Sequence, residues 1–183
     1  MIRLAPLSLT LAAAVLAACA QAPSKPSAAA PAAVPAALQP GAGQALVATI
    51  GANGVQIYEC RADKDKPGAA AWVFVAPEAD LLDAQGKTIG KHYAGPSWES
   101  LDGSKLVGTV KARAAAPQAG NIPWLLLTTR SVGPAGSFAK TNSIQRINTE
   151  GGEAPPAAGC TTAAIGKVER VGYTADYLLF ADK

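Results

Sequence analysis

The stretch Trp98–Val110 reads WESLDGSKLVGTV. At its centre, Asp102-Gly103 is a pair typical of tight hairpin turns, because glycine readily adopts the positive φ that such turns require. After the turn, Leu106 and Val110 fall on the same face of a period-two pattern, the repeat expected of a β-strand. This stretch therefore predicts an antiparallel β-hairpin.

The same alternation of short apolar runs and turn residues continues on both sides. Asn53-Gly54 separates Ala45–Ile50 from Val55–Cys60 and predicts a second hairpin. A glycine turn at residues 85–86 predicts a third. Further strands are predicted at residues 72–75, 124–129, 143–149 and 173–180.

Helical periodicity is nearly absent from the sequence. Glu78–Leu82 and Thr161–Ile165 are long enough for a helical turn or two and no more. The run Trp72–Val75 is expected to end at Pro77, which cannot donate to a sheet ladder. We predict an all-β fold, a single sandwich or barrel of short, mostly antiparallel strands with one or two short helical turns.

Residues 90–100, GKHYAGPSWES, contain the only histidine of the chain. Candidate ligand-binding residues here are His92, Tyr93, Trp98 and Glu99, with a glycine-proline turn between the two halves. One hypothesis is a pocket in which Trp98 stacks on a ligand ring while His92 and Glu99 exchange protons. The other is a rigid corner in which Trp98 is core and His92 bonds a buried carbonyl.

Standard catalytic motifs are missing from the sequence. It contains no Gly-rich phosphate-binding motif after a strand and no Gly-x-Ser-x-Gly elbow. A single histidine argues against a zinc site, and we expect no metal and no cofactor. A nucleophile pair of Ser97 and His92 has no support beyond the residue types. Trp72 and Trp124 lie in apolar runs and are expected in the core.

The charge of the chain is nearly balanced, with 16 basic and 13 acidic residues. Without a basic excess, nucleic acid is not an expected partner. Polar residues on the predicted strands are expected to form a solvated or hydrogen-bonded sheet face: Gln56, Tyr58, Gln145 and Arg146.

The first 40 residues differ from the rest, since they hold six of the 14 prolines and none of the 18 glycines. Residues 1–18 are predicted to be a signal peptide with a basic start and an apolar stretch. Residues 16–19, LAAC, resemble the bacterial lipobox, so Cys19 is the predicted lipidation site. Residues 19–40 then form a Pro/Ala-rich tether, and residues 41–183 a single β-rich domain.

The predicted export determines where the protein should lie and how its cysteines should behave. A lipid on Cys19 anchors the chain to a membrane, expected to be the outer membrane, facing the periplasm or the cell surface. Disulfides persist in such compartments, so Cys60 and Cys160 are predicted to form a bridge. Two buried free thiols or a redox pair are alternatives, although a redox pair usually has Cys-x-x-Cys spacing.

Several blocks in order resemble one domain-of-unknown-function family of secreted bacterial and fungal proteins, whose fungal members often carry the name malate dehydrogenase. The blocks are GVQIYEC (54–60), APEA (76–79), HYAGPSWES (92–100), DGS (102–104), IPWLLL (122–127), SIQRINT (143–149), GG (151–152), Cys160 and YTADY (173–177).

The resemblance covers about residues 45–180 and implies one exported β-rich domain with no established activity or catalytic residues. It includes both cysteine blocks, which agrees with a disulfide. A nicotinamide-dependent dehydrogenase is not expected, because that chemistry needs a parallel-sheet nucleotide fold and a Gly-rich phosphate turn.

The leading functional hypothesis is a non-catalytic binding or envelope-structural module, with a small molecule or a glycan as the ligand class. Its contact site would be the corner from His92 to Glu99. The alternative is a small periplasmic hydrolase or lyase that uses His92 and Glu99 as acid and base. That alternative requires both side chains in one open cleft, with His92 exposed.

Overall fold

The computed structural model describes Met1 and residues 33–183. Apart from Met1, the predicted signal peptide at 1–18, the lipidation site Cys19 and the tether as far as residue 32 lie outside the described residues. Within the described part of the chain, no helix is long and apolar enough to cross a membrane.

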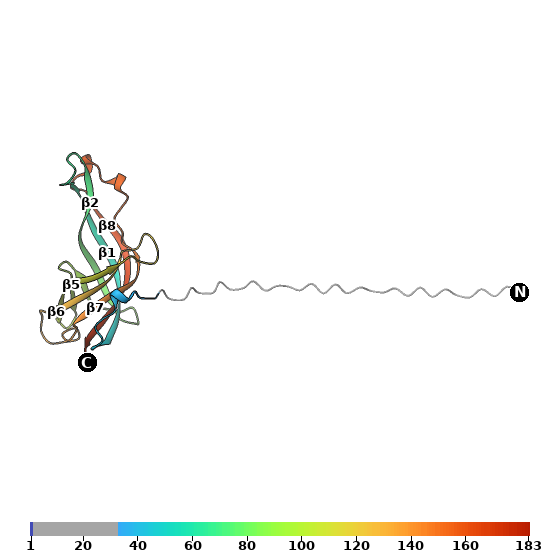
Figure 1. Ribbon diagram of the computed structural model, residues 1–183, viewed down its shortest axis with the longest axis vertical. Coiled ribbons are helices and arrows are strands. Elements are labelled where there is room, and N and C mark those ends of the chain that lie inside the picture. Colours follow the sequence, from blue (N-terminus) through green and yellow to red (C-terminus); the bar gives the residue numbers. More distant parts are fainter. Residues whose placement is uncertain (2–32) are drawn as a thin grey trace. The chain divides into compact units, whose positions relative to one another are not determined.

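Eight antiparallel strands form one sheet that closes into a barrel (Figure 1). Each strand pairs with its neighbours in the chain, and β1 pairs with β8 to complete the ring. The all-β prediction is confirmed. Because the sheet closes on itself, the architecture is the barrel and not the sandwich, which were the two alternatives predicted. The strands are β1 (Gln44–Ala62), β2 (Ala70–Leu82), β3 (Thr88–Tyr93), β4 (Ser97–Ser100), β5 (Lys105–Ala114), β6 (Trp124–Ser131), β7 (Ser143–Gly151) and β8 (Val168–Asp182).

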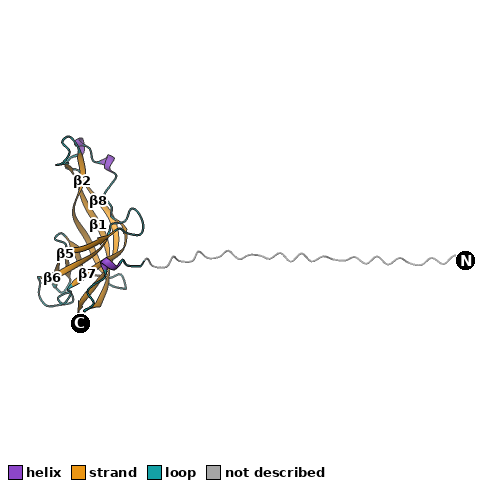
Figure 2. Cartoon of the chain, viewed as in Figure 1, coloured by secondary structure: helices purple, strands orange, loops and turns teal. Residues whose placement is uncertain are grey.

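Helical structure in the described residues is confined to three single-turn 3-10 helices (Figure 2). These are η1 (Ala36–Leu38), η2 (Ala157–Gly159) and η3 (Thr162–Ala164). The turn predicted within Thr161–Ile165 is confirmed by η3. The turn predicted at Glu78–Leu82 is wrong, because those residues belong to β2 and most of them pair with both β1 and β3.

The hairpin predicted at Asn53-Gly54 is also wrong. Both residues lie in the middle of β1, which pairs with β2 on one side and β8 on the other. Glycine is needed at position 54 because the two strands approach closely there: a Cβ would lie 2.1 Å from the Glu78 carbonyl oxygen. A glycine required by close approach has the same sequence signature as one required by a turn.

Pro77 does not end its strand, contrary to expectation. It lies opposite Gln56 within β2, in a part of the strand that pairs with β1 alone. Proline is tolerated on such an edge because no second neighbour needs its missing N–H. The hairpins predicted around residues 85–86 and 102–103 are confirmed as the β2–β3 and β4–β5 connections.

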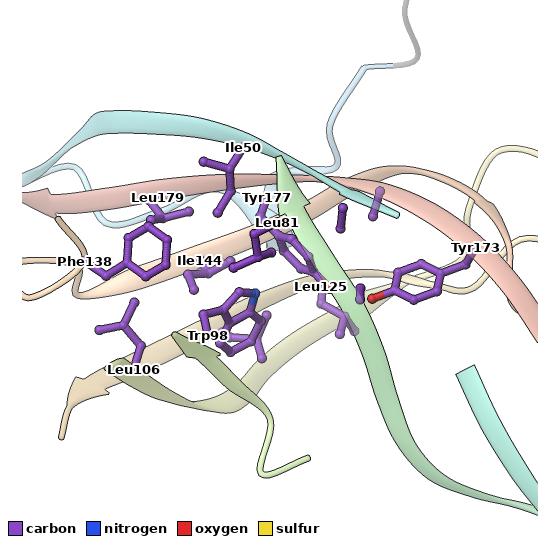
Figure 3. Close-up of a cluster of buried hydrophobic side chains, with 14 of the residues drawn as sticks. Ile50, Leu81, Trp98, Leu106, Leu125, Phe138, Ile144, Tyr173, Tyr177 and Leu179 are labelled. Atoms are coloured by element: carbon purple, nitrogen blue, oxygen red, sulfur yellow. The ribbon is translucent and has the colours of Figure 1, made fainter. Parts of the chain in front are cut away.

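The main hydrophobic core fills part of the barrel interior (Figure 3). Leu106, Phe138 and Leu179 pack on one side of the cluster and Tyr173 lies on the other, with Trp98 and Tyr177 between them. Trp98 and Tyr177 are at most 1% exposed. The core is therefore apolar at one end and rich in aromatic rings with polar atoms in its middle.

A second cluster lies on the outer face of the barrel. Trp124 and Leu126 alternate with inward-facing neighbours on β6, and Leu38 of η1 packs against them and is fully buried. The Gln145 amide donates to the Leu38 carbonyl at 2.7 Å. Trp124 is thus buried as predicted, and the folded domain begins before residue 41, where the tether was expected to end.

β1, β2 and β8 extend beyond the other strands, and η2 and η3 lie at that end (Figure 1). The Cys60–Cys160 disulfide joins β1 to the segment between η2 and η3, which confirms the predicted bridge. Trp72 also lies here and is only half-buried, with Nε1 donating to the Pro156 carbonyl. Its prediction as a core residue is wrong, because Trp72 packs on this end segment rather than inside the barrel.

Loss of the disulfide should destabilise the domain. In the variant Cys60→Ser/Cys160→Ser we expect the free energy of unfolding to fall by about 2–5 kcal/mol, because the unfolded chain regains the freedom of a long loop. Urea unfolding followed by tryptophan fluorescence measures this change. Reductant should produce a similar loss in the wild type and none in the variant; an effect of reductant on the variant would contradict the assignment.

The close approach at Gly54 should also be measurable. Gly54→Ala is expected to cost about 1–3 kcal/mol of unfolding free energy, because its methyl group meets the β2 backbone. Gly172→Ala is the matched control, since a Cβ at Gly172 in β8 meets no atom within 4 Å. Equal stability of the two variants in urea unfolding would show that close strand approach does not explain Gly54.

Candidate functional site

The barrel wall has a gap because β3 and β4 are short. β3 pairs only with residues 79–82 of β2, and β4 pairs only with residues 105–107 of β5. Residues 70–78 of β2 and 109–114 of β5 therefore have no strand partner on the edges that face this gap. The β3–β4 turn at residues 94–96 forms its third side. We call this gap the side opening.

Behind the side opening lies an interior cavity of about 560 Å³. This volume falls within the range usual for small-molecule sites. Apolar side chains of β2, β5 and β6 line the cavity together with backbone of the β3–β4 turn. The chemically informative lining residues are Gln56, Tyr58, His92, Trp98, Arg146 and Tyr177.

Three aromatic side chains that contact one another form one wall of the cavity. The rings of His92 and Trp98 lie 4.4 Å apart and nearly parallel, and Tyr177 packs edge-on against both. Gly108 on β5 makes room for this stack, because a Cβ there would lie 2.8 Å from the Trp98 ring. His92 and Trp98 are cross-strand partners on β3 and β4, so their side chains lie on the same face of the sheet.

His92 is fixed in one tautomer. Its Nδ1 lies 2.8 Å from the Ser97 carbonyl, which accepts only, so Nδ1 carries the proton and Nε2 is left as an acceptor. Burial is the main cause that lowers the pKa of His92; the hydrogen bond to Ser97 opposes this change and the Arg146 guanidinium adds to it, and the resulting pKa is about 4. His92 is therefore neutral at neutral pH. The contact with Ser97 is to its backbone, not to its hydroxyl.

Arg146 brings a positive charge to the cavity from β7. Its Nε and Nη2 groups donate to the Pro123 carbonyl at 3.2 and 2.7 Å. Its side chain is half-buried, and no carboxylate of the described residues lies within ion-pair distance. The cavity thus contains a cation without an anionic partner.

Several buried polar atoms of the cavity wall also have no hydrogen-bond partner among the described residues. They are Gln56 Nε2, Trp98 Nε1 and the Tyr177 hydroxyl. Burial raises the pKa of Tyr177, and the nearby Arg146 and Tyr173 side chains partly offset this increase. Neither side chain lies in hydrogen-bond geometry with the Tyr177 hydroxyl. Tyr58 differs, since its hydroxyl donates to the Gly152 carbonyl at 2.7 Å. Unpartnered buried donors are uncommon, and these can bond to water or to a ligand that enters the cavity.

The model of the family described as "Protein of unknown function (DUF3455)" matches residues 40–181. This range includes all eight strands except the last residue of β8. The chain belongs to this family. The resemblance to a domain-of-unknown-function family is therefore confirmed. No curated protein and no solved structure matches the chain.

The DUF3455 domain does not bring all four predicted site residues together. His92 and Trp98 line the interior cavity, but Tyr93 and Glu99 lie on the outer face, because neighbouring residues of a strand point to opposite sides. The Tyr93 hydroxyl donates to Glu99, and the Lys105 ammonium lies 3.7 Å from the same carboxylate. The acid–base pair of His92 and Glu99 is therefore wrong.

Sequence reasoning missed four informative residues of the DUF3455 cavity. Gln56, Tyr58 and Arg146 were assigned to a solvated or hydrogen-bonded sheet face, Tyr177 was placed only on a predicted strand, and all four line the interior. The sequence shows polar residues on these strands, but the pattern does not indicate which face of the strand points into the barrel. Among the described residues, no group of three or more His, Cys, Asp or Glu side chains is placed to hold a metal ion.

The low pKa of His92 makes the stability of the domain depend on pH. The unfolded histidine has a pKa near 6.5 and the folded one about 4, so the stabilisation is complete above pH 6.5 and is lost as pH falls towards 4. The full loss is about 3 kcal/mol. We expect His92→Gln to lack this component in urea unfolding at pH 7 and pH 4.5.

Carboxylates titrate in the same pH range, but they do so in both proteins and cancel in the difference between them. The stability difference between wild type and His92→Gln should therefore shrink as pH is lowered. A difference that stays constant across this range would show that His92 is not held neutral by burial.

Proposed function

We propose that this DUF3455 protein is a non-catalytic binding module of the bacterial cell envelope that takes a small, largely apolar molecule into the interior cavity. The observation that carries the proposal is the cavity itself, which has unpartnered polar atoms on its wall and an opening to solvent. An eight-stranded barrel has an interior large enough to hold one small ligand.

The rim of the side opening supports an apolar ligand. Phe74 and Val75 on the unpaired edge of β2 are 50% and 45% exposed, and Val110 on β5 is 45% exposed. All three line the cavity. Exposed large apolar side chains gathered at one mouth are typical of a surface that binds a ligand.

The geometry favours binding over catalysis. Nδ1 of His92 is engaged by a backbone carbonyl, and Glu99, its expected partner, lies outside the cavity. General acid–base catalysis needs a group within hydrogen-bond reach of the reacting proton, with a pKa near the working pH. A pKa of about 4 makes His92 a poor acid at neutral pH, although it suits a fixed hydrogen-bond acceptor.

The cellular setting of the proposal comes from the N-terminal residues. A signal peptide at 1–18, a lipid on Cys19 and a Pro/Ala-rich tether would hold the barrel near a membrane, at the outer membrane facing the periplasm or the cell surface. The Cys60–Cys160 disulfide suits an oxidising compartment of this kind.

The proposed function is tested with a neutral apolar probe. We expect N-phenylnaphthylamine to bind the full chain with a rise in probe fluorescence, because the cavity is largely apolar. Val110→Trp places a bulky ring at the side opening and should weaken binding about tenfold, through crowding of roughly 1–3 kcal/mol.

Val132→Trp is the matched control, since Val132 is similarly exposed, at 41%, but does not line the cavity. It should bind the probe as the wild type does. Equal binding by all three proteins would place the probe outside the cavity and contradict the proposal, as would the absence of binding to the wild type.

A further inference from the structure

The polar atoms of the interior cavity are predominantly hydrogen-bond donors. Gln56 Nε2 and Trp98 Nε1 can only donate, and the Tyr177 hydroxyl is able to donate. All three side chains are at least 97% buried and line the cavity. None of these atoms meets hydrogen-bond geometry with a partner in the described part of the chain, although the Tyr173 hydroxyl, which is itself unpartnered, lies near Gln56 and Tyr177. A ligand group that satisfies them must carry acceptors.

Arg146 adds a charge to the same set of donors. Two of its five N–H groups are used on the Pro123 carbonyl, so three are free to bind a ligand. Its guanidinium is close enough to lower the pKa of both His92 and Tyr177. A half-buried guanidinium beside unpartnered donors is a favourable site for a negatively charged oxygen pair, which it can bind in a forked geometry.

Other charged groups near the site do not neutralise Arg146. The Glu153 carboxylate is exposed and raises the pKa of Tyr58, but it forms no ion pair with Arg146. His92 is neutral. Arg113 lines the cavity on β5 but is exposed, so its charge is screened by solvent and adds to the positive character of the mouth.

The polar and apolar parts of the cavity come from different strands. Arg146 and Tyr177 lie on β7 and β8, across the ring from the short strands β3 and β4, and Gln56 lies on β1, which pairs with β2. The exposed apolar rim lies on β2 and β5, around the side opening. A molecule that satisfies both parts has an acidic head inside and an apolar body towards the opening.

We infer that the cavity binds an anionic amphiphile, with a carboxylate held by Arg146 and by the donors of Gln56 and Tyr177, and with its hydrocarbon part towards Phe74 and Val110. This inference rests on the proposed function and adds the chemical class of the ligand. The occupant is a small molecule with one acidic group on an apolar chain or ring. Neutral and cationic analogues of the same length lose the contact with the guanidinium.

Three probes of equal chain length test the inference: decanoate, decanol and decyltrimethylammonium. Binding to the full chain is measured by isothermal titration calorimetry. We expect the wild type to bind decanoate more tightly than decanol by about 10- to 100-fold, the usual effect of hydrogen bonds to a charged group. Decyltrimethylammonium should bind more weakly than decanol, because its charge is repelled by Arg146.

The variant Arg146→Gln should lose most of the preference for decanoate while it retains decanol binding, which also shows that it is folded. Arg146→Lys keeps the charge but loses the fork, and it should retain an intermediate preference. Arg113→Gln tests the competing position at the mouth, where solvent screens the charge, and its preference for decanoate should fall less than that of Arg146→Gln. Every protein carries the same N-terminal residues, so binding there cancels.

The outcomes separate this inference from the proposed function. If the wild type binds decanol and decanoate equally, the cavity binds apolar molecules but the acidic class is wrong. If Arg113→Gln abolishes the preference and Arg146→Gln does not, the head binds at the mouth, and the assignment to Arg146 is overturned. If no probe binds the wild type, both the inference and the proposed function fail. If Arg146→Gln loses decanol as well, Arg146→Lys becomes the test. An intermediate preference of Arg146→Lys for decanoate supports the inference, and equal binding of decanoate and decanol by this variant overturns it.

Discussion

The mutual packing of the Trp98, His92 and Tyr177 rings is the constraint on which the interior of the barrel depends. Eight strands enclose a space that side chains can just fill, so the placement of a few large rings decides whether any cavity is left. Trp98 fits only because Gly108 has no side chain. Leu106, Phe138 and Leu179 lie on one side of this stack (Figure 3). The stacked side chains themselves line the cavity.

The side opening follows from unequal strand lengths. β1, with 19 residues, pairs along most of its length on both sides, whereas β4 has only four residues. The tight turn between β3 and β4 brings the chain back before it can cover the upper part of β2, and the Gly108 N–H bonds the Pro96 carbonyl at the point where regular pairing ends. The same short hairpin that carries the aromatic stack therefore also leaves the wall open beside it.

Local turn chemistry was a reliable guide where glycine adopts positive φ, as at Gly86 and Gly103. It failed at Gly54, where glycine is required by the neighbouring strand and not by its own backbone angles. The cavity residues likewise fall into those that the sequence identified and those that it did not. His92 and Trp98 were found because their residue types are informative wherever they lie, whereas Arg146 resembled any arginine on a solvated strand until ring closure enclosed it.

The sequence alone determined the all-β class, most of the strand positions and the cysteine pair, because these depend on local periodicity, turn residues and a simple count of thiols. Only the tertiary structure decided which face of each strand lies inside. Alternation along a strand separates the side chains into two sets, but it does not tell which set points into the barrel and which points outward. The pairing of β1 with β8 closes the ring and encloses Gln56, Tyr177 and Arg146 in one cavity. The register of β3 against β4, in which His92 pairs with Trp98, places Glu99 on the opposite face from His92.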